Sequence, residues 1–105
     1  NMVRYLAHAV MHGGKVYRQS IVELDGTRVA VSRFDGEIHS TIFVSGIIVV
    51  APEQRITTVN IDQMKHILGR AELIETAIKR ISRYVIMRNL AVTPDETPTL
   101  VILQR

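Results

Sequence analysis

Apolar and polar residues alternate along the first part of the chain, which is the pattern of a β-strand. Between residues 3 and 12 one face carries Val3, Tyr5, Ala7, Ala9 and Met11, and the other carries Arg4, Leu6, His8, Val10 and His12. Gly13-Gly14 indicates a turn, and residues 16–24 then predict a returning strand in one or two pieces. We therefore expect the chain to open with a β-hairpin.

Asp25-Gly26 is the strongest hairpin signal in the sequence. A type I′ turn needs positive φ at both of its central residues, and Asp and Gly tolerate that conformation. We therefore expect a turn at this pair that joins a strand at Ile21–Leu24 to a strand at Val29–Arg33.

The next segment combines two further turn signals with many β-branched residues. Asp35-Gly36 predicts a turn, Glu37–Val44 a strand, and Ser45-Gly46 the end of that strand. Residues Ile47–Val50 are continuously apolar, which predicts a short separate strand that is buried on both faces and ended by Pro52.

Beyond Pro52 the apolar residues recur at the intervals of a helix. Asn60 and Gln63 have capping-box spacing, so a first helix is expected to begin at Asn60 and to end at Gly69. A second helix is expected from Arg70 to about Met87 and a stop at Asn89. Its apolar stripe consists of Ile74, Ala77, Ile78, Ile81 and Val85.

These elements predict a single domain over residues 1–105, with a β-rich part at 3–51, a helical part at 60–88 and a final strand at 99–104. A chain of 105 residues and 11.8 kDa can close one two-layer core. The expected fold class is α+β: a small twisted antiparallel β-sheet or sandwich, followed by two helices and a C-terminal strand that rejoins the sheet.

Composition narrows the function classes. Apolar residues make up 47% of the chain and charged residues 22%, which indicates a folded globular protein. The absence of Cys excludes disulfides, thiolate nucleophiles and Cys-based metal sites. The longest apolar run, Ile47–Ala51, is too short to cross a bilayer, and the N-terminus lacks the pattern of a signal peptide. We therefore expect a cytoplasmic protein with no membrane association.

The charge excess lies in the second half of the chain. Thirteen Lys and Arg against ten Asp and Glu give a net charge of +3, and Lys79, Arg80, Arg83 and Arg88 form a basic strip if their segment is helical. Such a strip can bind nucleic acid or another anion. However, Glu75 and Lys79 form a favourable i,i+4 pair, and an aromatic fraction of 5% leaves few stacking platforms. The pattern favours a solvated helix face over nucleic-acid binding.

Four histidines raise the question of a metal site, because His is a common metal ligand. His8 and His12 would lie about 13 Å apart on a strand, too far for one ion to bridge. His39 from a neighbouring strand could approach either one, so His8, His12 and His39 are the candidate ligand or metal residues. His66 lies four residues after Asp62, which is the spacing of a local surface pair on a helix.

No catalytic motif emerges from the sequence. His39 and Ser40 are neighbours on an expected strand and so point to opposite faces. The carboxylates that flank the turn glycines occupy their usual positions: Glu23, Asp25, Asp35 and Glu37. P-loop, G-x-G-x-x-G and H-E-x-x-H motifs are absent. We expect no enzymatic activity and no cofactor.

The order of features in the first half resembles the N-terminal β-segment of amidohydrolase-superfamily deaminases of the cytosine or aminodeoxyfutalosine deaminase type. The residues that carry the resemblance are Leu6–Val10, Gly14, Ser20–Val29 and Thr41–Pro52. In that family the last of these strands runs into a glycine and a His-x-His metal pair that opens a barrel. Here Glu53-Gln54-Arg55 follows Pro52, and too few residues remain for a barrel. The resemblance therefore implies a small β-domain without the metal centre.

Together these observations predict a non-catalytic domain that acts through self-association, as a homodimer, or through a protein partner, because the edges of a small sheet need covering. The alternative is a small-ligand or metal-binding domain related to an amidohydrolase β-domain, with the three candidate histidines around its site. Nucleic-acid binding along the basic strip is the weakest interpretation.

Overall fold

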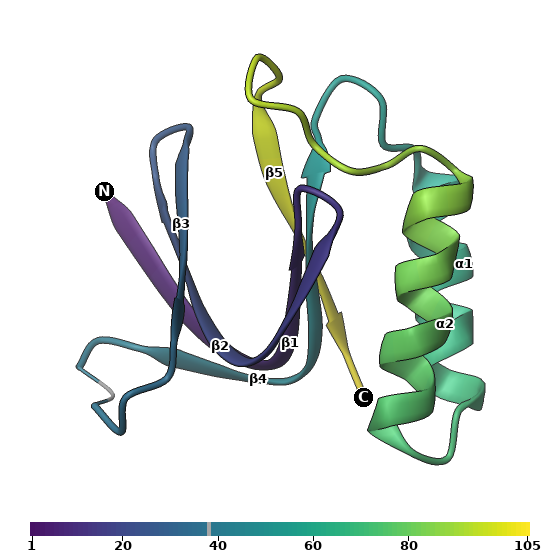
Figure 1. Ribbon diagram of the computed structural model, residues 1–105, viewed down its shortest axis with the longest axis horizontal. Helices are drawn as coiled ribbons and strands as arrows, with labels where there is room; N and C mark the ends of the chain where they lie inside the picture. Colours follow the sequence, from purple (N-terminus) through teal and green to yellow (C-terminus); the bar gives the residue numbers. More distant parts are fainter. Residues whose placement is uncertain (38) are drawn as a thin grey trace.

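Seven helices and strands follow one another in the computed structural model, which describes residues 1–37 and 39–105. They are β1 (Met2–His12), β2 (Lys15–Asp25), β3 (Arg28–Arg33), β4 (Ile42–Pro52), α1 (Thr58–Arg70), α2 (Ile74–Met87) and β5 (Pro98–Gln104). The strands form one sheet in the order β3-β2-β1-β4-β5. Both helices lie together on one side of it (Figure 1).

This architecture confirms the predicted α+β class and the C-terminal strand that rejoins the sheet. The prediction of an antiparallel sheet is wrong for one pair, because β4 runs parallel to β1, from Ile42 beside Tyr5 to Val49 beside Met11. Side chains alternate between the two faces of a strand whichever way its neighbour runs. The hydrophobic pattern therefore could not show the direction of this pairing.

The sheet is sharply bent across its central strands, as Figure 1 shows. At the bend the register between β1 and β4 shifts by one residue, so that Ser45 and Gly46 together stand opposite His8. In β2, Gln19 has a φ of 50°, in the left-handed region. An extra residue in one strand and a left-handed residue in another both turn the local chain direction. These irregularities lie side by side and together produce the bend.

The bend also exchanges the two faces of β1. Tyr5, Ala7 and Val10 pack into one apolar cluster, whereas Ala9 and Met11 pack into the other. The predicted continuous face from Val3 to Met11 is therefore wrong beyond His8. Alternation with a period of two has no signal for a bulge, and a shift of one residue moves every following side chain to the opposite face.

The two apolar clusters lie on opposite sides of the sheet and make up the core. The helix-side cluster packs α1 and α2 against β1, β4 and β5, and its fully buried side chains include Ile47, Met64, Leu68, Ile81 and Leu103. The second cluster fills the side of the sheet away from the helices and contains Ala7, Val10, Val22, Val44, Ile48, Val50 and Val92. The continuously apolar run Ile47–Val50 is buried on both faces, as predicted.

β4 is one strand rather than the two that the sequence predicts. Ser45-Gly46 does not end a strand but lies at the bend, inside β4. Gly46 is required by space, because a Cβ there would overlap the carbonyl oxygen of Leu103 on β5. The strand expected over Glu37–Val44 begins only at Ile42, and Ile38 lies outside the described residues.

The two hairpin turns are also assigned differently by the structure. Gly13 and Gly14, with φ values of 59° and 83°, form the two-residue turn between β1 and β2, and positive φ at both residues fits type I′. Asp25 is still paired within the β2–β3 ladder, so the second turn consists of Gly26 and Thr27. Only Gly26 has positive φ there, which fits a type II′ turn rather than the predicted type I′.

Both helices begin at residues other than those predicted. The N-cap of α1 is Thr57 rather than Asn60: Thr57 Oγ1 accepts a hydrogen bond from Asn60 N at 3.0 Å, and Asn60 Oδ1 accepts one from Thr57 N at 3.0 Å. A capping box is therefore present, but it begins one turn earlier than the sequence predicts. α1 ends at Arg70, and α2 begins at Ile74 rather than at Arg70.

The end of α2 confirms the predicted stop at Asn89. Asn89 has a φ of 55°, and its N–H donates to the carbonyl of Ile86, while Leu90 N–H donates to the carbonyl of Val85. This pair of bonds is the Schellman arrangement at a helix C-terminus. Within residues 1–37 and 39–105, neither helix is long and apolar enough to cross a membrane.

Candidate functional site

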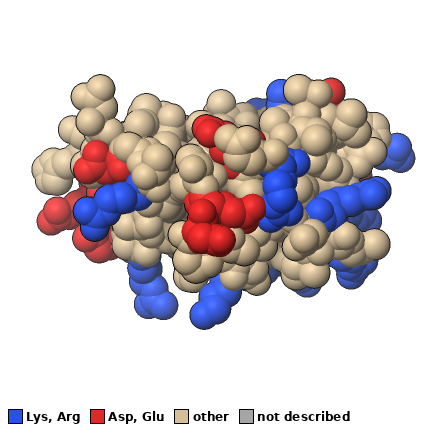
Figure 2. Space-filling view, turned by 90° about the horizontal axis from the view of Figure 1, so that it is seen from above, with Lys and Arg blue, Asp and Glu red and all other residues tan. Residues whose placement is uncertain are grey.

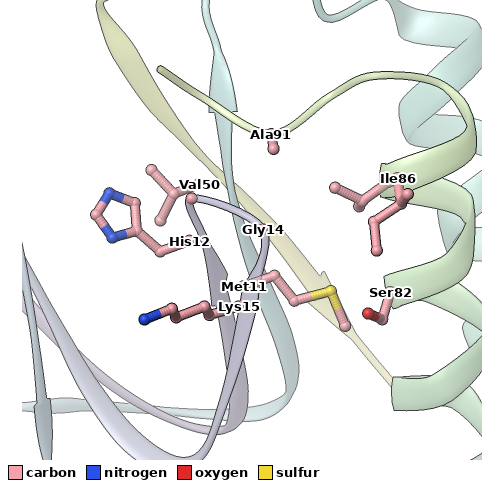
Figure 3. A pocket seen from close by; sticks show the side chains of 10 residues that line it. Met11, His12, Gly14, Lys15, Val50, Ser82, Ile86 and Ala91 are labelled. Carbon is pink, nitrogen blue, oxygen red and sulfur yellow. The ribbon is translucent and has the colours of Figure 1, made fainter. Parts of the chain in front are cut away.

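The three candidate histidines lie in different surroundings. The ring of His8 meets the ring of Phe43 edge-on, with centroids 5.7 Å apart. His12 lies at the end of β1, and its side chain points away from α2 (Figure 3). His39 is exposed, and its Nε2 lies 3.8 Å from a carboxylate oxygen of Glu37. Among residues 1–37 and 39–105, no three His, Asp or Glu side chains gather to hold a metal ion.

Several of the carboxylates near the turns have structural contacts. Arg4 Nη1 donates to Glu23 Oε2 at 2.7 Å, which ties β1 to β2 on their shared face. Asp35 Oδ1 accepts a hydrogen bond from the N–H of Glu37 at 2.9 Å, as in an Asx turn. These contacts stabilise a strand pair and a loop, and they place no two carboxylates as an acid and a base.

The basic strip is divided by the geometry of α2. Successive helix residues are about 100° apart, so Lys79 and Arg83 lie within about 40° of each other and Arg80 lies beyond them. Lys79 and Arg83 border a groove between α2 and β2, whereas Arg80 borders a separate hollow with Arg70. Arg88 follows the helix, and its guanidinium lies over the ring of Tyr84, 5.4 Å from the centroid. The four residues therefore do not form one continuous strip.

The net positive charge of the chain is concentrated in its helices. Residues 58–88 contain six Lys or Arg against three Asp or Glu, an excess that equals the +3 of the whole chain. Figure 2 shows the consequence, because Lys and Arg predominate at the helical end of the molecule while acidic side chains gather mainly at its middle and at the opposite end. An anionic partner would thus be attracted to the helical end.

A bidentate ion pair links β2 to the start of α2. Arg18 Nη2 lies 2.6 Å from Glu75 Oε2, and Arg18 Nε lies 3.0 Å from Glu75 Oε1. The hydrogen bonds from Arg18 lower the pKa of Glu75, and Lys79 adds a weaker attraction of the same sign. Glu75 was expected to pair with Lys79, but Arg18 takes its carboxylate instead. Lys79 is therefore left to face the groove.

The groove between α2 and β2 is the strongest candidate for a functional site. Its lining residues are Val16, Arg18, Ile78, Lys79, Ser82, Arg83, Ile86 and Met87. Ile86 and Met87 are 62% and 75% exposed, although both are large apolar side chains. Glu75, whose pKa Lys79 also lowers, is already paired with Arg18. The surface thus combines exposed apolar area with two cations, Lys79 and Arg83, that form no ion pair among the described residues.

The groove continues toward the β1–β2 turn, where Figure 3 shows its end. Met11 extends from β1 toward Ser82 of α2, and Ile86 points into the same space. Lys15, like His12, points away from the helix. Ser82 and Ile86 line both parts, so the surface is continuous along one flank of α2. Its floor at this end is apolar.

Among the described residues, the first part of β2 has a partner strand on one side only. β1 pairs with β2 over its whole length, but β3 pairs with it only from Ser20 to Asp25. Phe34 N–H donates to the carbonyl of Gln19 at 3.3 Å, and pairing on this side ends there. The segment Lys15–Arg18 is therefore a free sheet edge. Because Val16 and Arg18 line the groove, this edge borders it directly.

A second groove lies between the two helices. Its lining residues are Val59, Asp62, Gln63, His66, Ile67 and Tyr84. The hydroxyl of Tyr84 donates to Gln63 Oε1 at 2.7 Å and accepts from Asn60 Nδ2 at 3.1 Å. His66 and Asp62 thus share one surface, as their spacing predicts. Because Tyr84 is hydrogen-bonded to two residues of α1, this groove is a contact between the helices with a polar rim.

Comparisons with protein-family models, with curated proteins and with solved structures each give no match for this chain. The resemblance to amidohydrolase-superfamily deaminases therefore stays a prediction.

Part of the candidate groove was accessible to sequence reasoning. Lys79 and Arg83 belong to the predicted basic strip, and the predicted apolar stripe of this helix does not include Ile86 and Met87. Arg18 and the free edge beside it gave no signal. Their role depends on where β3 stops and on which helix packs against β2, and neither is a local property of the sequence.

Proposed function

We propose that this chain is a non-catalytic protein-binding domain that holds its partner in the groove between α2 and β2. The observation that carries the proposal is the coincidence of three features at one place: the free edge Lys15–Arg18, the exposed side chains of Ile86 and Met87, and the cations Lys79 and Arg83. Unpaired strand edges and exposed apolar patches are each typical of interaction surfaces.

The charge of the groove favours a different protein over a second copy of this chain. In a symmetric dimer built on this surface, the same patch of both copies would meet. Lys79 and Arg83 of both copies would then lie in one interface, and bringing like charges together is destabilising. We therefore propose a heterologous partner and expect the purified chain to be a monomer in native mass spectrometry.

Site-specific photo-crosslinking tests the proposal. A benzophenone amino acid is introduced at Met87, inside the groove, and at Ala30, an exposed residue of β3 outside it. In extracts of the source cells, Met87 should give a discrete crosslinked product and Ala30 should not. The product should disappear in a Lys79→Glu, Arg83→Glu double variant.

Arg80→Glu provides the matched control, because it makes the same kind of charge change on the same helix but outside the groove. The product should survive this change. A crosslinked species with twice the mass of the chain would overturn the heterologous partner in favour of self-association. Equal labelling from both positions, or loss of the product in the control, would overturn the groove as the binding surface.

A further inference from the structure

The backbone of the free edge specifies how a partner segment can bind, provided that the proposed groove is the binding surface. In an antiparallel ladder, alternate residues direct their N–H and C=O groups toward opposite neighbours. Along Lys15–Arg18, every second residue therefore presents both groups to the side that no strand occupies. Ser20 Oγ donates to the carbonyl of Arg18 at 2.9 Å, which closes this edge at its C-terminal end. An extended segment can satisfy the remaining groups by joining the sheet.

The length of the groove matches a short strand. From Ile78 to Met87 the helix rises about 14 Å at 1.5 Å per residue. An extended segment covers that distance in about four steps of 3.3 Å, that is, with about five residues. The free edge Lys15–Arg18 spans about 10 Å, so it borders most of the length of the slot beside the helix.

The side chains along the slot specify the sequence of the segment. Lys79 and Arg83 are four helix residues apart and are thus separated by about 6 Å along the axis. On one face of a strand, alternate residues are separated by about 6.6 Å. Carboxylates at alternate positions of an added strand would therefore stand opposite the two cations. The next position on the same face would meet the exposed apolar side chains of Ile86 and Met87.

The direction of the segment follows from the ion pair at the end of the groove. Arg18 lies beside Glu75 at the start of α2, while the β1–β2 turn lies near Ile86 at its other end. β2 therefore runs opposite to α2. A segment with its acidic residues first and its apolar residue last follows α2 and lies antiparallel to β2, which is the slightly more stable mode of pairing.

We infer that the partner contributes an extended segment of the pattern acidic-x-acidic-x-apolar, which adds to the sheet as an antiparallel strand on the edge Lys15–Arg18. Its two carboxylates pair with Lys79 and Arg83, and its apolar side chain packs against Ile86 and Met87. Nucleic acid fits less well, because none of the described residues that line the groove is aromatic and could stack against a base.

Two other surfaces are less suited to bind an extended acidic segment. The outer edge of β3 is short and begins and ends with Arg28 and Arg33, which is a common way to discourage strand pairing. The groove between the helices has no strand backbone in its lining and includes a carboxylate, Asp62, beside its apolar residues.

The inference is tested with a nine-residue peptide that contains Glu-Thr-Glu-Thr-Leu between serines, titrated into the ¹⁵N-labelled protein. We expect the amide chemical shifts of residues that line the groove to change, and the backbone amides within Lys15–Arg18 to exchange their hydrogens more slowly. A peptide with Gln in place of both Glu residues should bind at least tenfold more weakly. The Lys79→Glu, Arg83→Glu variant should show the same loss for the parent peptide, whereas Arg80→Glu should change the affinity less than threefold.

Methylation of peptide nitrogens separates strand addition from simple charge attraction. An added strand uses only alternate N–H groups, so one of two alternating methylation patterns should abolish binding and the other should leave it nearly unchanged. Equal effects of both patterns would overturn strand addition. If a peptide with the reversed sequence binds equally well, the inferred strand direction is wrong. If a single-stranded oligonucleotide displaces the peptide at the same concentration, the groove is a general anion-binding surface instead.

The outcomes also distinguish this inference from the proposed function. If Met87 crosslinks to a partner but no peptide protects the Lys15–Arg18 amides, partner binding stands and strand addition is wrong. If Met87 gives no crosslink that depends on Lys79 and Arg83, and the peptide does not bind, both are wrong.

Discussion

Replacing Gly46 by alanine should destabilise the fold severely, because β4 and β5 leave no room for a side chain there. A Cβ at this position would overlap the carbonyl oxygen of Leu103 and would lie 3.0 Å from its carbonyl carbon and 3.1 Å from the Cα of Gln104. These are backbone atoms, so no rotamer change can relieve the contact. Gly46 does not have positive φ, so the requirement is one of space and not of backbone conformation.

The cost can be worked out from the contacts that must move. If β5 separates from β4 at Gly46, about two backbone hydrogen bonds are lost or strained, each with a net value of about 1 kcal/mol. Overpacking adds about 1–3 kcal/mol. The sum, about 3–5 kcal/mol, is a large fraction of the roughly 5–15 kcal/mol that stabilises a domain of this size. At about 4–8 °C per kcal/mol, the melting temperature should fall by more than about 12 °C.

Thermal unfolding followed by circular dichroism measures this effect, with urea unfolding as the second assay. Gly69→Ala is the matched control, because Gly69 lies in α1 and a Cβ there meets nothing within 4 Å. The control should be neutral or more stable by up to about 1 kcal/mol, since alanine favours helix over glycine. A Gly46→Ala protein that unfolds within about 1 kcal/mol of the wild type would refute the close approach of β4 and β5.

Two further predictions concern a loop ion pair and a helix cap. The guanidinium of Arg55 and hydrogen bonds from Thr93 lower the pKa of Glu96 to about 2, below the value of 4.5 for a free side chain. The stabilisation from this carboxylate is therefore complete above about pH 4.5 and is lost as the pH falls toward 2, so acid should lower the melting temperature of the wild type more steeply than that of Glu96→Gln. Parallel acid profiles of the two proteins would contradict the ion pair. Thr57→Ala should cost about 1 kcal/mol in urea unfolding, because it removes the N-cap of α1. If Thr57→Ala leaves the free energy of unfolding unchanged while Asn60→Ala lowers it, Asn60 and not Thr57 is the N-cap.

The amphipathic pattern of the sequence predicted most of the elements but not their irregularities. The apolar stripe of α2 is buried as its period required, with Ala77, Ile78, Ile81 and Val85 in the core. The bulge opposite His8 was missed, because an extra residue in one strand is defined only against its neighbour. The sequence indicated a capping box for α1 but assigned it to the wrong residues. Asn60 is the N3 residue of the box and not its N-cap, and the three-residue spacing from Asn60 to Gln63 imitates the same motif.

The candidate groove shows the same division. Lys79 and Arg83 could be named from the charge pattern, and so could the helix that carries them. Arg88 does not belong to the basic strip, because α2 ends at Met87. The guanidinium of Arg88 lies over the ring of Tyr84 instead. Arg18 entered the site only because β2 passes beside α2 and its guanidinium reaches Glu75.

The sequence by itself determined the α+β class, the approximate positions of strands and helices, and the exclusion of cysteine chemistry, because these depend on residue type and on periods of two or 3.6 residues. The tertiary structure alone decided that β4 runs parallel to β1, that the sheet bends at His8, and that the edge Lys15–Arg18 stays free beside α2. These features arise from contacts between segments far apart in the chain. Their free energy depends on register and close packing, which no local pattern of residues encodes.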